Sequence, residues 1–241
     1  MAACTLGLRM TSRRVTSESA PPTHRLRDAL SELPLFPLPD VVLYPGVLLP
    51  LHVFEPRYRT MLRDVMRSHG ALAVVQISPT ANEGGLDAAD RKPELATVAG
   101  AGLVLEQEVL ADGRSNIVIQ GVARVSLAEL PMEGPYRRAK ATLLEEPPSL
   151  VSDVDLTSLV HSAAAFIAEV KRRDPRFAFR SPTTMTPGSI ADACAFHLII
   201  DPRARQELLQ ELDPERRVTR VIAELAAQRL DLEGQKHTVL H

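Results

Sequence analysis

The stretch LPLFPLPDVVLYPGVLLPLHVFEPRYR, at residues 33–59, most constrains how this chain can fold. It is the most apolar part of the sequence, yet six prolines interrupt it. Each proline lacks a backbone N–H and fixes φ, so neither a long helix nor a central strand can run through the stretch. The pattern therefore predicts short strands near a sheet edge, with turns at Asp40 and at Pro45–Gly46.

The large apolar side chains between these prolines are expected to be core. The residues that we expect to be largely buried are Leu35, Phe36, Leu43, Leu49, Leu51, Val53 and Phe54. Pro56 has a separate role, because a proline at the first helical position loses no hydrogen bond. We expect a helix from Pro56 to about His69–Gly70, with apolar residues on one face and arginines on the other.

More strand signals follow up to about residue 145. The sequence predicts strands near 71–77, 101–110, 115–127 and 136–144. Asp112–Gly113 is a hairpin turn signal, and Gly121 indicates a bulge or bend in the returning strand. A polar loop at 79–94 separates the first two of these strands.

Beyond Pro147–Pro148 the apolar period changes from two to 3.6, which predicts helices. Three of them share one start signal, a capping side chain directly before a proline: Thr186–Pro187, Asp201–Pro202 and Asp213–Pro214. We therefore expect an α+β chain divided into a disordered or loosely ordered tail, a β subdomain, a linker, an α-helical bundle and a second tail. The expected boundaries are 1–32, 33–145, 146–150, 151–234 and 235–241.

Composition and motifs argue against several classes of function. The 241 residues carry a net charge of −2, which does not favour nucleic-acid binding, and no run of 18 apolar residues predicts a membrane span. The sequence contains no P-loop, no G-x-S-x-G elbow and no H-E-x-x-H motif. Cys4 and Cys194 form neither a disulfide framework nor a zinc knuckle, and Cys194 is expected to be an inert core thiol. We expect no enzyme activity, no metal and no cofactor.

Three separated segments together resemble the Lon protease N-terminal (substrate-binding) domain. They are the opening stretch at 33–59, the run from Asp112–Arg114 into NIVIQGVARV, and DPRARQELLQELDPERRV at 201–218. The resemblance extends from about Leu33 to Leu232. It implies a PUA-like β-barrel followed by a four-helix unit, in a stand-alone form without the ATPase and peptidase domains. One departure is Ala99–Gly100, where the family usually has its glycine one position earlier.

The resemblance also implies a role as a non-enzymatic module that binds polypeptides. We expect unfolded or extended polypeptides as partners, a separate ATP-dependent protease as a second partner, self-association no stronger than a weak homodimer, and a cytoplasmic location. The candidate binding residues are Tyr44, Leu48, Arg57, Tyr58 and Gly84.

Two alternatives stay open at this point. The first is binding of RNA or a small ligand through the barrel, which rests on fold analogy alone. The second is a hydrolase, which would need a Ser or Cys within hydrogen-bond reach of His52, His161 or His197.

Overall fold

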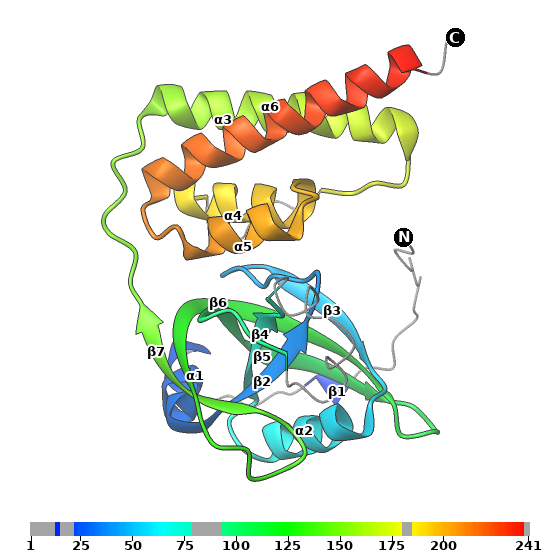
Figure 1. Cartoon of the computed structure of the whole chain (residues 1–241), viewed down its shortest axis with the longest axis vertical. Coiled ribbons are helices and arrows are strands. Elements are labelled where there is room, and N and C mark those ends of the chain that lie inside the picture. Colours follow the sequence, from blue (N-terminus) through cyan, green and yellow to red (C-terminus); the bar gives the residue numbers. More distant parts are fainter. Residues whose placement is uncertain (1–12, 15–21, 79–92, 180–184, 239–241) are drawn as a thin grey trace.

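The computed structural model describes residues 13–14, 22–78, 93–179 and 185–238, and these form a β-barrel in one half of the molecule and a four-helix unit in the other (Figure 1). The strands are β1 Arg13–Arg14, β2 Leu33–Leu38, β3 Leu48–Val53, β4 Ala71–Gln76, β5 Val98–Val109, β6 Ser115–Glu129 and β7 Arg138–Leu144. The helices are α1 Pro22–Ala29, the short 3₁₀ helix η1 Leu30–Glu32, α2 Pro56–Arg67, α3 Asp153–Arg173, α4 Pro187–Leu198, α5 Pro202–Gln210 and α6 Pro214–Thr238.

Five strands close the barrel. They pair in the order β5, β4, β2, β7 and β6, and β6 pairs again with β5. Among the strand pairs that the structure describes, only β2 and β4 run parallel. β1 attaches outside the barrel to β5, and β3 attaches outside it to β6. The expected α+β plan of a barrel followed by four helices is therefore confirmed.

β6 serves two partners because it bends in its middle. Its residues 115–120 pair with β3, and its residues 124–129 pair with β7. The register with β5 shifts between these two halves, next to Gly121. A Cβ built on Gly121 would lie 1.9 Å from the carbonyl oxygen of Tyr44, so only glycine lets the two backbones come this close. The expected bend at Gly121 is therefore present.

The N-terminal residues nearest the barrel differ from the expectation of a loose tail over 1–32. Pro22–Ala29 and Leu30–Glu32 are helical, and the helix is tied to the barrel by Leu26, which is only 1% exposed. Leu26 packs in a cluster with Leu33 and Leu35 of β2. The correction has a simple physical cause, because burying one leucine side chain stabilises the ordered helix by about 2 kcal/mol.

The opening apolar stretch is mostly core, as expected. Leu35, Phe36, Leu43, Leu49 and Val53 are all at most 6% exposed. Leu51 is half-buried. The expectation was wrong for Phe54, which is 59% exposed.

α2 follows this stretch and closes one side of the barrel. Its buried side chains are Tyr58, Met61, Leu62 and Val65, which join a cluster with Leu49 and Val53 of β3. The three- and four-residue spacing expected from the sequence is therefore confirmed for this helix.

The four helices form two layers above the barrel. Figure 1 shows α3 and α6 as the outer layer, with α4 and α5 between them and the strands. All three expected caps are in place: Thr186 accepts from Ser189 N, Asp201 from Arg203 N, and Asp213 from Glu215 N. Within the described parts of the chain, no helix combines the length and apolar character that crossing a membrane requires.

Candidate functional site

β3 exposes one row of side chains at the edge of the sheet. Its inner residues Leu49 and Val53 are buried, and its outer residues Leu48, Pro50 and His52 are exposed, followed by Phe54. We call these four exposed residues the β3 surface. Among the described residues β3 pairs only with β6, so its other edge carries no neighbouring strand.

The backbone register shows why a proline fits in this strand. Gly121 of β6 donates its N–H to Val47 O, and Ile119, two residues earlier, therefore also faces β3. Its partner Leu49 then faces β6, and the next residue, Pro50, faces away. The N–H that Pro50 lacks would have pointed to the free edge, so the proline costs no ladder hydrogen bond. The backbone groups of Leu48 and His52 point to the same free edge.

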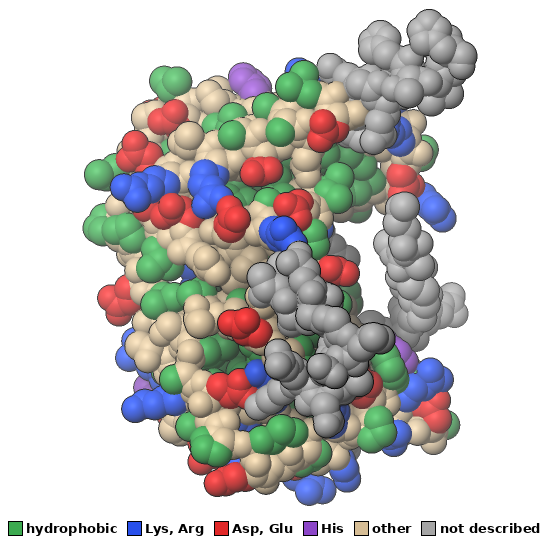
Figure 2. Space-filling model, viewed as in Figure 1, with side chains coloured by type: hydrophobic (Ala, Val, Ile, Leu, Met, Phe, Trp, Pro, Cys, Tyr) green, Lys and Arg blue, Asp and Glu red, His purple; other side chains and the backbone are tan. Residues whose placement is uncertain are grey.

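The basic face of α2 begins next to the exposed end of β3. Arg57, Arg63 and Arg67 are exposed, and Arg59 is half-buried. Arg59 lies against the β5–β6 turn, because its Nη2 is 2.0 Å from where a Cβ on Gly113 would be. Figure 2 shows blue side chains gathered along the lower edge of the molecule, where α2 lies in Figure 1.

The five candidate residues that the sequence suggested differ in exposure and do not form one surface. Leu48 is 42% exposed on the β3 surface, and Arg57 is exposed at the start of α2. Tyr58 is only 7% exposed; its ring packs against Phe36 with centroids 4.6 Å apart, and burial raises the pKa of its hydroxyl. Gly84 lies outside the described residues.

Tyr44 is the clearest correction among these candidates. It is completely buried, and its hydroxyl donates to Arg205 O of α5 over 2.5 Å. Burial, and after it the charge of Asp192, raise the pKa of Tyr44. Tyr44 therefore joins the barrel to the helices and offers no exposed surface.

Sequence reasoning missed Phe54 as a surface residue. Val53 points into the barrel, so the period of two along the strand turns Phe54 outwards. Counting from Val53 could have revealed this. His52 is exposed as well; its Nδ1 lies 2.8 Å from Asn116 Oδ1, and its ring stacks beside Phe54 at 6.2 Å.

A cluster of charged side chains lies between the barrel and the helices. Arg124 donates from Nη1 to Glu146 at 2.5 Å and from Nη2 to Asp192 at 2.6 Å. Arg217 donates to the same Glu146 oxygen at 2.8 Å, and its Nε lies 3.0 Å from Asp192 Oδ1. We call these four residues the charge cluster. Burial raises the pKa of Asp192, and the two guanidinium groups act in the opposite direction.

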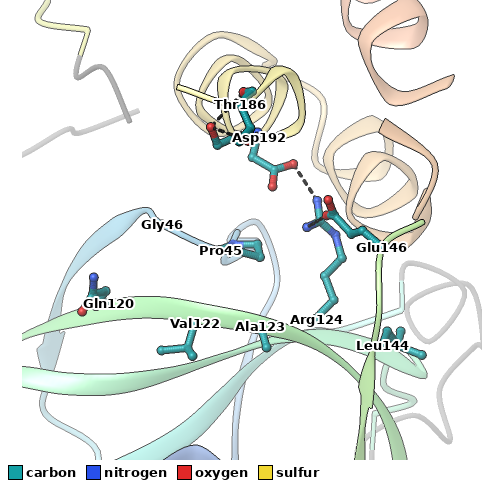
Figure 3. A pocket seen from close by; sticks show the side chains of 11 residues that line it. Pro45, Gly46, Gln120, Val122, Ala123, Arg124, Leu144, Glu146, Thr186 and Asp192 are labelled. Carbon is teal, nitrogen blue, oxygen red and sulfur yellow. Dashed lines mark hydrogen bonds and ion pairs between the residues drawn. The ribbon is translucent and has the colours of Figure 1, made fainter. Parts of the chain in front are cut away.

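A cavity of about 500 Å³ opens beside the charge cluster. Its walls are the Pro45–Gly46 turn, the bend of β6 and the start of α4, and Figure 3 shows Arg124 reaching from β6 towards Asp192 across it. The charged side chains on its wall, Arg124, Glu146 and Asp192, are paired with one another. Among the described residues, no three His, Cys, Asp or Glu side chains gather in a way that could hold a metal ion.

Comparison with known sequences gives a consistent result. The family model described as the ATP-dependent protease La (LON) substrate-binding domain matches residues 32–227. The Lon protease of Roseiflexus castenholzii is 29% identical over 212 residues, which cover 86% of this chain and 25% of that protein. The Lon protease of Escherichia coli strain K12 is 26% identical over 197 residues, covering 80% and 24%. The chain thus spans about a quarter of the length of the curated relatives it matches.

Two solved structures share the fold. A Lon N-terminal domain protein from Xanthomonas campestris has a TM-score of 0.58 at 22% identity, covering 80% of this chain and 97% of that one. The N-terminal domain of the Mycobacterium avium complex Lon protease has a TM-score of 0.57 at 16% identity, covering 81% and 98%. At such identities the likeness concerns the fold alone. Because the family model matches most of the chain, this protein belongs to the Lon substrate-binding domain family.

Proposed function

We propose that this protein binds unfolded or extended polypeptides through the β3 surface. The family description names substrate binding, and the structure adds a strand with exposed apolar side chains and with one edge that no described residue pairs with. The observation that carries the proposal is the exposure of Leu48 in β3 and of Phe54 directly after it, at 42% and 59%, beside the buried Leu49 and Val53. An extended polypeptide can add to such an edge as a further strand and pack alternate side chains against it.

The free edge limits what can bind there. A folded protein has satisfied its own backbone hydrogen bonds, whereas an unfolded segment can pair with the outward N–H and C=O groups of Leu48 and His52. The proposal therefore concerns polypeptides with exposed backbone. It extends to a role as a recognition adaptor for a separate ATP-dependent protease in the cytoplasm, with self-association no stronger than a weak homodimer.

The proposal is tested with one labelled polypeptide in two states. A carboxamidomethylated, permanently unfolded polypeptide and its folded, disulfide-bonded parent are titrated with the protein, and binding is followed by fluorescence anisotropy. We expect the unfolded form to bind at least about tenfold more tightly, a difference of about 1.4 kcal/mol. Equal binding of the two forms would contradict the proposal.

Surface variants locate the site. We expect Leu48→Ser and Phe54→Ser to weaken binding of the unfolded form, because each removes exposed apolar area that the polypeptide would cover. Val154→Ser is the matched control, since Val154 is 74% exposed on α3, away from β3. Unfolding in urea should show that all three variants keep their stability. If Val154→Ser weakens binding as much as Phe54→Ser does, the β3 surface is not the site.

A further inference from the structure

The solvent face of α2 carries a row of arginines. Arg59, Arg63 and Arg67 follow one another at four-residue spacing along the helix. Arg57 is already paired with Glu55 at 2.7 Å. The pKa of Asp112 is lowered chiefly by a hydrogen bond from the backbone N–H of Arg114 and least by the charge of nearby Arg59. Across the described residues, by contrast, neither Arg63 nor Arg67 has an acidic side chain within ion-pair distance. Arg63 donates to Thr60 Oγ1 over 2.9 Å, and this acceptor is neutral.

This arginine row adjoins the β3 surface. Only Glu55 separates Phe54 from the first residue of α2. Arg59 covers the turn at Gly113, and this turn leads into Ser115, the partner of Val53 at the end of β3. A polypeptide that runs along β3 past Phe54 therefore reaches the arginine row of α2 next.

The spacing of the row suits an extended chain. Residues four apart on a helix are separated by about 6 Å along its axis. Alternate residues of an extended polypeptide are about 6.6 Å apart on one face. Acidic side chains at alternate positions could therefore pair one by one with successive arginines.

We propose that the β3 surface and the arginine row together select polypeptide segments in which an apolar stretch is joined to alternating acidic residues. This inference rests on the proposed function and adds a charge preference to it. An extended polypeptide fits better than a nucleic acid, because Phe54 is the one exposed Phe, Tyr or Trp among the described side chains and the whole chain has a net charge of −2. Opposite charges across an interface contribute more to such selectivity than to the affinity itself.

The test uses three labelled peptides that share one apolar stretch. Their flanks carry three Glu, three Ser or three Lys residues at alternate positions, and anisotropy gives Kd at low and at high NaCl concentration. We expect the Glu peptide to bind about fivefold more tightly than the Ser peptide, and the Lys peptide to bind most weakly. The preference should shrink at high salt, because exposed charges are screened.

Charge-reversal variants assign the preference to residues. The double variant Arg63→Glu/Arg67→Glu should lose the preference for the Glu peptide but still bind the Ser peptide. Arg216→Glu is the control, because Arg216 is 75% exposed near the start of α6, in the other half of the molecule. It should leave all three affinities unchanged.

The outcomes separate this inference from the proposed function. If wild-type protein binds the Glu, Ser and Lys peptides equally, the charge preference is overturned and polypeptide binding stands. If none of the peptides and no unfolded polypeptide binds, the proposed function itself fails. If a single-stranded RNA displaces the Glu peptide and Arg63→Glu/Arg67→Glu abolishes RNA binding, the row belongs to a nucleic-acid site and the inference is overturned.

Discussion

Arg124 on β6 donates from Nη2 to Oδ1 of Asp192 on α4 over 2.6 Å, across the boundary between the barrel and the helical unit. Both side chains are almost fully buried, at 2% and 4% exposure. Glu146 and Arg217 complete the charge cluster, so two positive and two negative groups balance one another. This pairing holds the two halves of the molecule in one arrangement.

Arg124→Met should destabilise the protein by about 3–5 kcal/mol, because it leaves buried negative charge only partly compensated. The free energy of unfolding in urea measures this loss. Arg216→Met, at a side chain that is 75% exposed, should change it by less than about 0.5 kcal/mol.

A double variant tests whether the loss comes from the charge and not from the packing of Arg124. Arg124→Met/Asp192→Leu leaves Arg217 paired with Glu146, so it should be more stable than Arg124→Met alone. If the losses of unfolding free energy from Arg124→Met and Asp192→Leu simply added in the double variant, the Arg124–Asp192 charge pair would not be the cause of the loss.

Gly121→Ala should destabilise the barrel by about 1–3 kcal/mol, because its new Cβ would overlap Tyr44 O and force the two backbones apart. Gly134→Ala is the matched control, since nothing lies within 4 Å of a Cβ at that position. Thermal unfolding of the two variants gives the comparison. Equal melting temperatures for both would show that β6 can bend without the close approach at Gly121.

Tyr44→Phe should cost about 1 kcal/mol of unfolding free energy, because it leaves Arg205 O without its buried hydroxyl donor. Tyr136→Phe removes a hydroxyl that donates to Asp64 at an exposed site, where water can replace it, and should cost less. Urea titrations of the two variants measure both losses of unfolding free energy. A larger loss for Tyr136→Phe would argue against a joining role for Tyr44.

Cys194 should resist alkylation in the folded protein. It is 1% exposed, and burial raises the pKa of its thiol to about 12. At pH 8 only about 10⁻⁴ of such a thiol is the reactive thiolate, so the reaction should be slow until the protein unfolds. The measurement is the rate of thiol modification in a Cys4→Ser variant, with and without denaturant. Equal rates in both conditions would contradict the burial of Cys194.

Local patterns were read well from the sequence. The caps at Thr186, Asp201 and Asp213 depend only on a side chain and the next few backbone N–H groups, so the sequence predicts them directly. The prolines in the opening stretch likewise act on their own backbone, and they predicted the short edge strand β3. The same expectation was wrong for β2, which contains two prolines and yet lies between β4 and β7. The change of period near Pro147–Pro148 separated the barrel from the four helices.

Exposure was harder to predict from the same residues. Phe54 and Tyr44 are both large aromatic side chains of the same proline-rich stretch, yet one is 59% exposed and the other completely buried. Hydrophobicity predicts that such residues tend to be inside, but the sequence does not state which face of a strand is covered. The approach of α5 to Tyr44 covers one of them, and the free face of β3 leaves the other in solvent.

The sequence by itself determined the local elements, their order and the family, because these depend on neighbouring residues and on recurring motifs. Only the tertiary structure decided that Arg124 meets Asp192, 68 positions later in the chain, and that the arginines of α2 adjoin the exposed row of β3. Such pairs form when distant segments pack together, and the balance of burial against charge at each contact depends on geometry that no local pattern contains.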